Sequence, residues 1–448
     1  MTKWWYIVLF ALVVAFPSSL PASEKANVSE APAPVQVRPS QETVTAEQNK
    51  TPVNQNEAEI QEQHVLKPEA QQPEIAKEHT PVVPKAQLHE MPTPQATRAV
   101  DRSIWLFTER IKEKFSLWLS RSGRYLAMMK EILKAKNIPE DIAFLSLIES
   151  GFNPSAYSVA RAVGPWQFIA STAKRYGLTI DWWRDERRDP VKSTKAAANY
   201  LRDLYEMFGS WNLAMAAYNA GEGKILRAVN RTRSDDYWGL LNTQYIKRET
   251  KEYVPKFMAA KLIASNPDDY GFANLDYHPP LQYDEVVLDK PVDLDVAAKS
   301  AETTLEEMRE LNPELRRWST PPHVYDYVLR IPYGRKEIFL ANLSAVPEEE
   351  HFSVATYTVK KGDTIKKVSA STGIPVNVIL ELNDDKGLRP LVAGEKLYLP
   401  PKEKFSLDRD DRAQGKKVAV KSRKARAKKQ GSKKVIASLH KKQGDVND

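Results

Sequence analysis

The sequence contains no cysteine in its 448 residues, which excludes structural disulfides, cysteine-ligated zinc and thiol catalysis. It also predicts that no lipoprotein anchor is attached, because that anchor needs an amino-terminal cysteine. Histidine is scarce: there are seven, and none lies between residues 101 and 270. A histidine-based metal site or a Ser-His-Asp triad cannot be assembled from that segment. We therefore expect no metal and no cofactor there.

Long apolar runs are also missing, apart from one at the amino terminus. Residues 4–16 follow Lys3 without a charge, a length too short to span a bilayer comfortably but typical of a signal-peptide core. We predict a signal peptide over residues 1–22, cleaved near Ala22, with a retained anchor as the alternative. Residues 23–100 are rich in Pro, Glu, Gln, Ala and Val without a sustained period, which predicts a disordered linker. We expect an exported protein.

Helical patterning replaces this composition from about residue 103. The spacing of apolar residues predicts helices over 105–117, 125–133, 192–208, 211–220 and 250–265. A segment of about 165 residues is long enough to bury its own core. We therefore predict a mostly helical domain at residues 101–270.

One helix of this domain is predicted to end in a carboxylate. Pro139 and Glu140 suit a first helical turn, an apolar run follows, and Gly151 ends the helix. Glu149 would lose hydration in such surroundings, which raises the pKa of its carboxyl. A carboxylic acid still protonated near neutral pH is what general acid catalysis of glycosidic-bond cleavage requires. The alternative is an ordinary surface glutamate.

Four further motifs follow Glu149 in order. They are Ser158, Gly164-Pro165-Trp166-Gln167-Phe168, Ala217-Tyr218-Asn219-Ala220-Gly221, and Glu249-Thr250 with Tyr253-Val254. Over roughly residues 105–265 this set closely resembles the lytic murein transglycosylases with a goose-lysozyme-like (SLT) catalytic domain, and the modules that follow favour the membrane-bound D type. The sequence departs from the family at Gly-Pro-Trp-Gln, where many relatives have Gly-Leu-Met-Gln. We expect Trp166 to keep a large apolar wall of the pocket.

The resemblance also implies roles for individual residues. Glu149 would be the catalytic residue, and the substrate-binding residues would be Ser158, Gln167, Tyr218, Asn219 and Tyr253. Tyr218 and Asn219 would orient the carboxylate and the acetamido group of the sugar through hydroxyl and amide hydrogen bonds. Tyr253 would close the pocket near Glu149.

The remaining sequence contains an internal repeat with an offset of about 71 residues. The second copy opens with Tyr357-Thr-Val-Lys-Lys-Gly-Asp-Thr364 and strongly resembles the lysin motif (LysM), a strand–helix–helix–strand module that binds N-acetylglucosamine polymers. We predict a LysM domain at 355–401. The first copy lacks the Gly-Asp-Thr opening, so we predict a degenerate LysM-like module at 280–345, with an unrelated small α+β domain as the alternative. The predicted fold class is α+β: a lysozyme-like helical domain followed by small βααβ modules.

The carboxyl-terminal residues carry the excess of basic charge. Residues 401–448 contain sixteen Lys or Arg against six Asp or Glu. We predict a basic disordered tail at 402–448, which would attract polyanions such as anionic envelope polymers. A merely solvated tail is the alternative, and no nucleic-acid partner is expected for an exported protein.

The resemblance implies a function in the periplasm, with peptidoglycan glycan strands as the partner. A single Glu149 would cleave the bond between N-acetylmuramic acid and N-acetylglucosamine without net water and form 1,6-anhydro ends. A hydrolytic muramidase is one alternative; it needs a second carboxylate, for which Asp181, Asp185 and Asp189 are candidates by proximity in sequence. A catalytically silent wall-binding scaffold is another.

Overall fold

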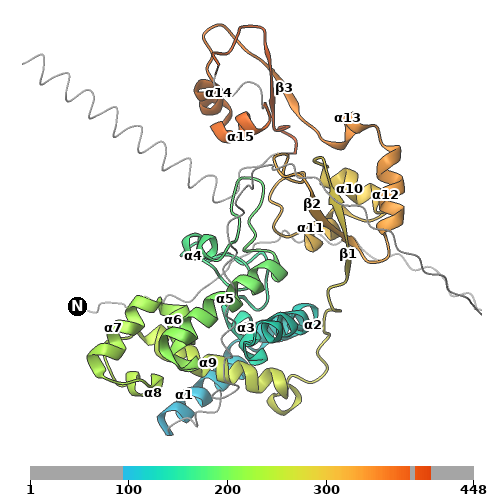
Figure 1. Cartoon of the computed structure of the whole chain (residues 1–448). Helices are drawn as coiled ribbons and strands as arrows, with labels where there is room; N and C mark the ends of the chain where they lie inside the picture. The colour runs from blue at the N-terminus through green and yellow to red at the C-terminus, as the bar shows by residue number, and fades with distance from the viewer. Residues whose placement is uncertain (1–93, 384–388, 405–448) are drawn as a thin grey trace, which may run out of the picture. The chain divides into compact units, whose positions relative to one another are not determined.

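A computed structural model of the protein describes residues 94–383 and 389–404. The predicted signal peptide, most of the predicted linker and nearly all of the basic tail lie outside the described residues. Within those two ranges, no helix combines the length and apolarity needed to cross a membrane. The described part is mostly helical with two small antiparallel sheets, which confirms the α+β fold class (Figure 1).

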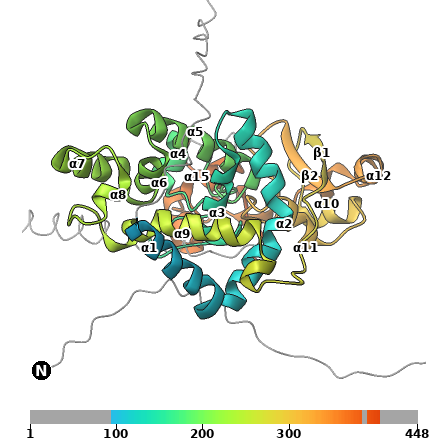
Figure 2. The ribbon, with the colours of Figure 1, turned by 90° about the horizontal axis from the view of Figure 1, so that it is seen from below.

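The first helices differ from the predicted pair. Helix α1 (Pro94–Trp105) begins inside the segment predicted as linker, and a π-helical turn (Leu106–Arg110) separates it from the long helix α2 (Lys112–Ala135). Ala99 and Val100 are buried, and α1 packs beside α9 (Arg248–Ser265) (Figures 1 and 2). The linker boundary at residue 100 was wrong because the Pro- and Gln-rich composition before it concealed this short apolar pattern.

The segment that ends at Glu149 is not one continuous α-helix. Pro139 has an extended ψ of 129° and precedes a 3₁₀ turn (Glu140–Ala143), which leads into helix α3 (Phe144–Ser150). The carbonyl of Pro139 accepts from the N–H of Ile142 at 3.0 Å, and this bond between residues three apart closes the tight 3₁₀ turn. The helix ends at Gly151 as predicted, where the backbone turns left-handed with φ 61°.

Six helices complete the described part of the domain. They are α4 (Ala170–Arg175), α5 (Pro190–Phe208), α6 (Trp211–Ala220), α7 (Glu222–Thr232), α8 (Tyr237–Leu240) and α9, followed by a 3₁₀ turn (Asp268–Tyr270). The predictions over 192–208, 211–220 and 250–265 are confirmed. Side-chain caps fix three starts: Asp189 accepts from two backbone N–H groups of α5, Ser210 accepts from one of α6, and Asp236 accepts from one of α8.

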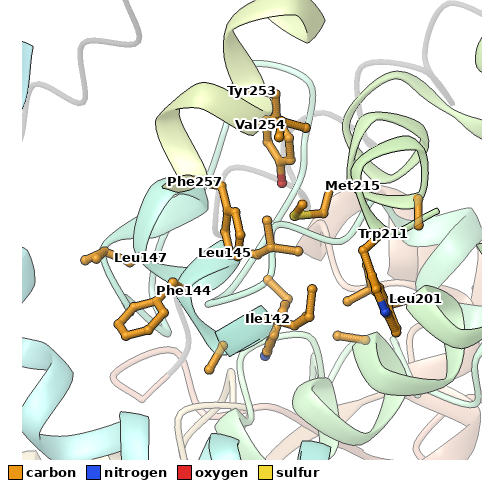
Figure 3. Close-up of a cluster of buried hydrophobic side chains, with 14 of the residues drawn as sticks. Ile142, Phe144, Leu145, Leu147, Leu201, Trp211, Met215, Tyr253, Val254 and Phe257 are labelled. Atoms are coloured by element: carbon orange, nitrogen blue, oxygen red, sulfur yellow. The ribbon is translucent and has the colours of Figure 1, made fainter. Parts of the chain in front are cut away.

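These helices share one hydrophobic core, and α3 is embedded in it. Leu145, Leu147, Trp211 and Phe257 are almost completely buried, and Figure 3 shows side chains of α3, α6 and α9 converging there. Burial of each such large side chain contributes about 1.5–3 kcal/mol. The position of the α3 backbone is therefore fixed by packing.

Two strand–helix–helix–strand modules follow. In the first, β1 (Tyr283–Leu288) pairs antiparallel with β2 (Tyr327–Pro332) around α10 (Leu294–Ser300) and α11 (Leu305–Leu311). In the second, β3 (Ala355–Thr358) pairs with β4 (Lys396–Leu399) around α14 (Ile365–Thr372) and α15 (Val376–Glu381). Helices α12 (Lys336–Ala345) and α13 (Glu348–His351) connect them.

An asparagine at the corresponding position of each module forms the same two hydrogen bonds with the last strand. Asn312 donates to the carbonyl of Arg330 and accepts from its N–H, at 2.7 and 2.9 Å. Asn383 bonds the backbone of Tyr398 in the same way, at 2.8 and 2.9 Å. Each asparagine joins the end of the second helix to the last strand. The first copy thus has the lysin-motif topology despite its altered opening, and the alternative of an unrelated small domain is wrong.

Gly151 supports a prediction of stability. A Cβ at Gly151 would lie 2.1 Å from the Trp118 ring, whereas Gly209, with a similar φ of 65°, has nothing within 4 Å of its Cβ position. Alanine at either position costs about 1–2 kcal/mol of backbone strain, and overpacking at Gly151 adds about 1–3 kcal/mol. Gly151→Ala should therefore lower the free energy of unfolding in urea more than Gly209→Ala does. Equal losses would contradict this steric argument.

Candidate active site

Glu149 occupies the last turn of α3 and is half-buried. Its Oε1 accepts a hydrogen bond of 2.6 Å from the hydroxyl of Tyr253, which Figure 3 shows directed from α9 into the buried cluster. Burial raises the pKa of Glu149 to about 7; the Tyr253 hydrogen bond acts in the opposite direction, and the nearby charge of Glu249 adds to the rise. The expectation of a poorly hydrated carboxyl therefore agrees with this geometry.

Two tyrosines face this carboxyl as neutral hydroxyl groups. Burial, followed by the negative charge of Glu149, raises the pKa of both Tyr253 and Tyr218 well above 10. Tyr218 donates its hydroxyl to the backbone carbonyl of Trp166 at 2.7 Å, and not to Glu149. Tyr253 therefore orients the carboxylate directly, whereas Tyr218 fixes the loop that carries Trp166.

Asn219 lies at the end of α6 and is oriented by the next motif. Its Oδ1 accepts a hydrogen bond of 3.0 Å from the Thr250 hydroxyl of α9. Among the described residues the amide NH₂ of Asn219 has no hydrogen-bond partner, so both of its donors remain available. Thr250 was part of a motif but was not predicted as a site residue; its position beside Tyr253 on α9 was the available signal.

The loop between α3 and α4 carries the remaining predicted residues. Ser158 is buried, and its Oγ accepts from the backbone N–H of Ala162 at 3.0 Å, which closes a turn. Gln167 is half-buried with a left-handed φ of 49°, and its amide donates to the carbonyl of Gly164 at 2.9 Å. Both side chains thus shape the loop, and neither forms a hydrogen bond with Glu149.

Trp166 differs from its expected role as a wall of the pocket. The side chain is fully buried, and its indole N–H donates to the Thr194 hydroxyl of α5 at 2.8 Å. The large ring therefore supports the loop from inside the core, because the core offers both apolar surface and a partner for the indole N–H.

Two serines that the sequence did not single out join the loop to α3. The hydroxyls of Ser146 and Ser150 both donate to the carbonyl of Pro165, at 3.1 and 2.8 Å. Residues four apart lie on one face of a helix, so this spacing was a readable signal. The carbonyl of Pro165 is thus fixed beside the turn that carries Glu149.

Comparisons with known proteins match three parts of the chain. Residues 127–241 match the Transglycosylase SLT domain, residues 282–348 the LysM-like domain of lytic transglycosylase MltD, and residues 357–400 the LysM domain. The membrane-bound lytic murein transglycosylase D of Escherichia coli is 29% identical over 336 residues, covering 67% of this chain and 73% of the relative. The membrane-bound lytic murein transglycosylase C of Haemophilus ducreyi is 25% identical over 166 residues, or 32% and 45%.

This chain is a homologue of the lytic murein transglycosylases. The SLT and LysM domains indicate a peptidoglycan lytic transglycosylase, and the resemblance seen in the motifs is confirmed. Among solved structures, the 70 kDa soluble lytic transglycosylase of Escherichia coli matches with a TM-score of 0.31 and 21% identity, covering 41% of this chain. The homologue described here spans 32% of that longer chain.

The three aspartates considered for a hydrolytic mechanism have structural partners in this homologue. Asp181 accepts from the backbone N–H groups of Trp183 and Arg184. Asp185 forms a buried ion pair with Arg187, and Asp189 caps α5 and pairs with Arg330. Across residues 94–383 and 389–404, no cluster of three or more His, Asp or Glu suits a metal ion.

The raised pKa of Glu149 predicts a pH-dependent stability. Between its ordinary value of 4.5 and about 7, the folded protein binds the proton that the unfolded chain has released, so the free energy of unfolding falls as pH rises through this window. Glu149→Gln removes this loss. Relative to wild type, the variant should gain about 2–3 kcal/mol between pH 5 and pH 8 in urea denaturation. The exposed Glu140→Gln is the control, and an equal gain there would contradict the prediction.

Proposed function

We propose that this homologue cleaves the β-1,4 bond between N-acetylmuramic acid and N-acetylglucosamine without net water, leaving 1,6-anhydro-N-acetylmuramic acid ends. The observation that carries the proposal is Glu149, whose pKa of about 7 and hydrogen bond to Tyr253 suit one group that gives and later takes a proton. A carboxyl with its pKa near the working pH is populated in both forms.

The proposed reaction has two proton transfers through one carboxyl. Tyr253 occupies Oε1 of Glu149, which leaves Oε2 to protonate the glycosidic oxygen as the bond to the muramyl anomeric carbon breaks. The acetamido carbonyl of the substrate stabilises the cation formed at that carbon. The Glu149 carboxylate then takes the proton of the muramyl 6-hydroxyl, whose oxygen attacks the same carbon. The ring closes, and Glu149 regains its proton.

The remaining predicted site residues receive binding roles in this proposal. The free amide NH₂ of Asn219 would donate to the acetamido oxygen, because Thr250 already holds the other end of the amide. Gln167 and Ser158 would present the loop to the sugar or its lactyl side chain, and Tyr218 would hold that loop through the carbonyl of Trp166.

We also propose where this homologue works. Peptidoglycan lies outside the cytoplasmic membrane, so the signal peptide predicted at 1–22 would deliver the enzyme to the periplasm. The LysM domain at 355–401 would bind N-acetylglucosamine polymer and keep the enzyme on its substrate. The tail at 402–448 would add attraction to anionic envelope polymers, which salt would weaken.

A hydrolytic muramidase has less support. It needs a carboxylate placed to activate water, and Asp181, Asp185 and Asp189 are occupied by backbone, arginine and cap interactions. Glu249 is the carboxylate whose charge reaches Glu149, but its side chain is exposed at the start of α9. A wall-binding scaffold without catalytic activity would not need the hydrogen-bonded pair of Glu149 and Tyr253.

Glu149→Gln tests the proposed reaction. Loss of a positioned general acid and base should slow release of soluble fragments from purified peptidoglycan by about 100- to 10,000-fold. Mass spectrometry should show wild-type fragments lighter by one water than hydrolysis products. Binding to sacculi should persist in the variant, and Glu140→Gln should keep full activity. Fragments with ordinary reducing ends would instead identify a hydrolase, and continued release by Glu149→Gln would exclude this residue.

Tyr253→Phe tests the hydrogen bond to Glu149. The hydroxyl stabilises the charged carboxylate, so its removal should raise the pKa of Glu149 further. The alkaline limb of the pH–rate profile should move upward by about one pH unit, as expected for a hydrogen bond to a charged group. A limb that stays in place or moves to lower pH contradicts direct coupling between these side chains.

A further inference from the structure

The backbone of residues 181–185 in the SLT domain is bonded to the first LysM-like module. The N–H of Asp185 donates to the carbonyl of Glu314 at 2.8 Å, and the N–H of Arg316 donates to the carbonyl of Trp183 at 2.8 Å. Side chains add to this pairing. Arg316 donates to the carbonyl of Asp181 at 2.7 Å and Arg317 to that of Trp182 at 2.8 Å. We refer to residues 314–317 as the clamp.

The contacts around the clamp are buried. The guanidinium of Arg317 lies 4.0 Å from the centre of the Trp182 ring, and both residues are buried. Arg330 of β2 pairs with the fully buried Asp189 at 2.9 Å. Backbone bonds protected from water hold a fixed geometry more firmly than exposed contacts do. Residues 181–189 therefore take their position from the module.

Arg187 transmits this position to the loop of the active site. Its guanidinium donates twice to the Asp185 carboxylate, at 2.8 and 2.7 Å, and to the carbonyls of Arg161 and Phe168, at 3.0 and 3.1 Å. The loop also lies directly on this segment, since a Cβ at Gly164 would lie 1.8 Å from the Arg187 carbonyl oxygen. One arginine thus holds the middle of the loop, at Arg161, and its last part, at Phe168.

The loop in turn touches the surroundings of Glu149. The carbonyl of Pro165 accepts from Ser150, the residue after Glu149, and the carbonyl of Trp166 accepts from Tyr218. We propose that the first LysM-like module is a positioning element of the active site, acting through the clamp and Arg187, and that Arg187 is a positioning residue. This inference rests on the proposed function. It gives the degenerate module a use other than binding the cell wall.

The test compares two pairs of arginines in the full-length protein. Arg316→Ala/Arg317→Ala removes the side-chain bonds of the clamp. The control Arg309→Ala/Arg335→Ala removes two other arginines of the same module, the exposed Arg309 and the half-buried Arg335, which pairs with Glu302. We expect the clamp variant to lose about 10- to 100-fold in kcat on soluble peptidoglycan strands, because small misplacement of reacting groups has effects of this size. KM, sacculus binding and the thermal midpoint of the LysM domain should stay near wild type.

Variants of Arg187 test the same inference if the clamp variant does not fold. Arg187→Met should lose kcat in the same way, and Arg187→Lys should restore part of it, because an ammonium can reach some but not all of the four acceptor oxygens. Unchanged kcat in folded clamp and Arg187 variants, or equal losses in the control Arg309→Ala/Arg335→Ala, would overturn the inference. Absence of anhydro products from the wild type would instead overturn the proposed function.

Discussion

The site depends on the hydrogen bond between the hydroxyl of Tyr253 and the carboxyl of Glu149 in a place from which water is largely removed. Burial alone would favour the protonated acid, while the tyrosine favours the carboxylate. The two effects together leave the pKa of Glu149 at about 7. Burial of this acid lowers the free energy of unfolding by less than the packing of α3 and α9 into the common core raises it. The domain therefore stays folded with the acid in place.

Backbone carbonyls connect this acid to the rest of the domain. The carbonyls of Pro165 and Trp166 accept from Ser150 and Tyr218, so the loop is bonded both to α3, which carries Glu149, and to α6. Gly164 lies against the backbone carbonyl of Arg187, and this close approach is possible because glycine has no Cβ. The residues of this loop that look functional in the sequence, Ser158 and Gln167, make their hydrogen bonds within the loop. Their identity therefore determines the shape of the loop.

The two modules show how one topology serves different surroundings. Asn312 and Asn383 bond the last strand in the same way, so both copies keep the same fold. The first copy directs Arg316, Arg317 and Arg330 toward the SLT domain, where they are matched by carbonyls, an indole and Asp189. The polar side chains of the first copy thus bond the SLT domain within the same chain.

The sequence by itself determined the local features. These are the apolar periodicity of the long helices, the left-handed end of α3 at Gly151 and the repeated asparagines Asn312 and Asn383. The motifs around and after Glu149 also indicated the resemblance to the transglycosylases. These follow from interactions between residues near in sequence or from patterns that a family shares. The start of α1, the burial of Trp166, the bond from Tyr218 to a carbonyl and the use of Arg187 depended on partners far along the chain. Only tertiary structure decided these, because a side chain's donors and acceptors do not reveal which of many distant partners the packed core will bring within reach.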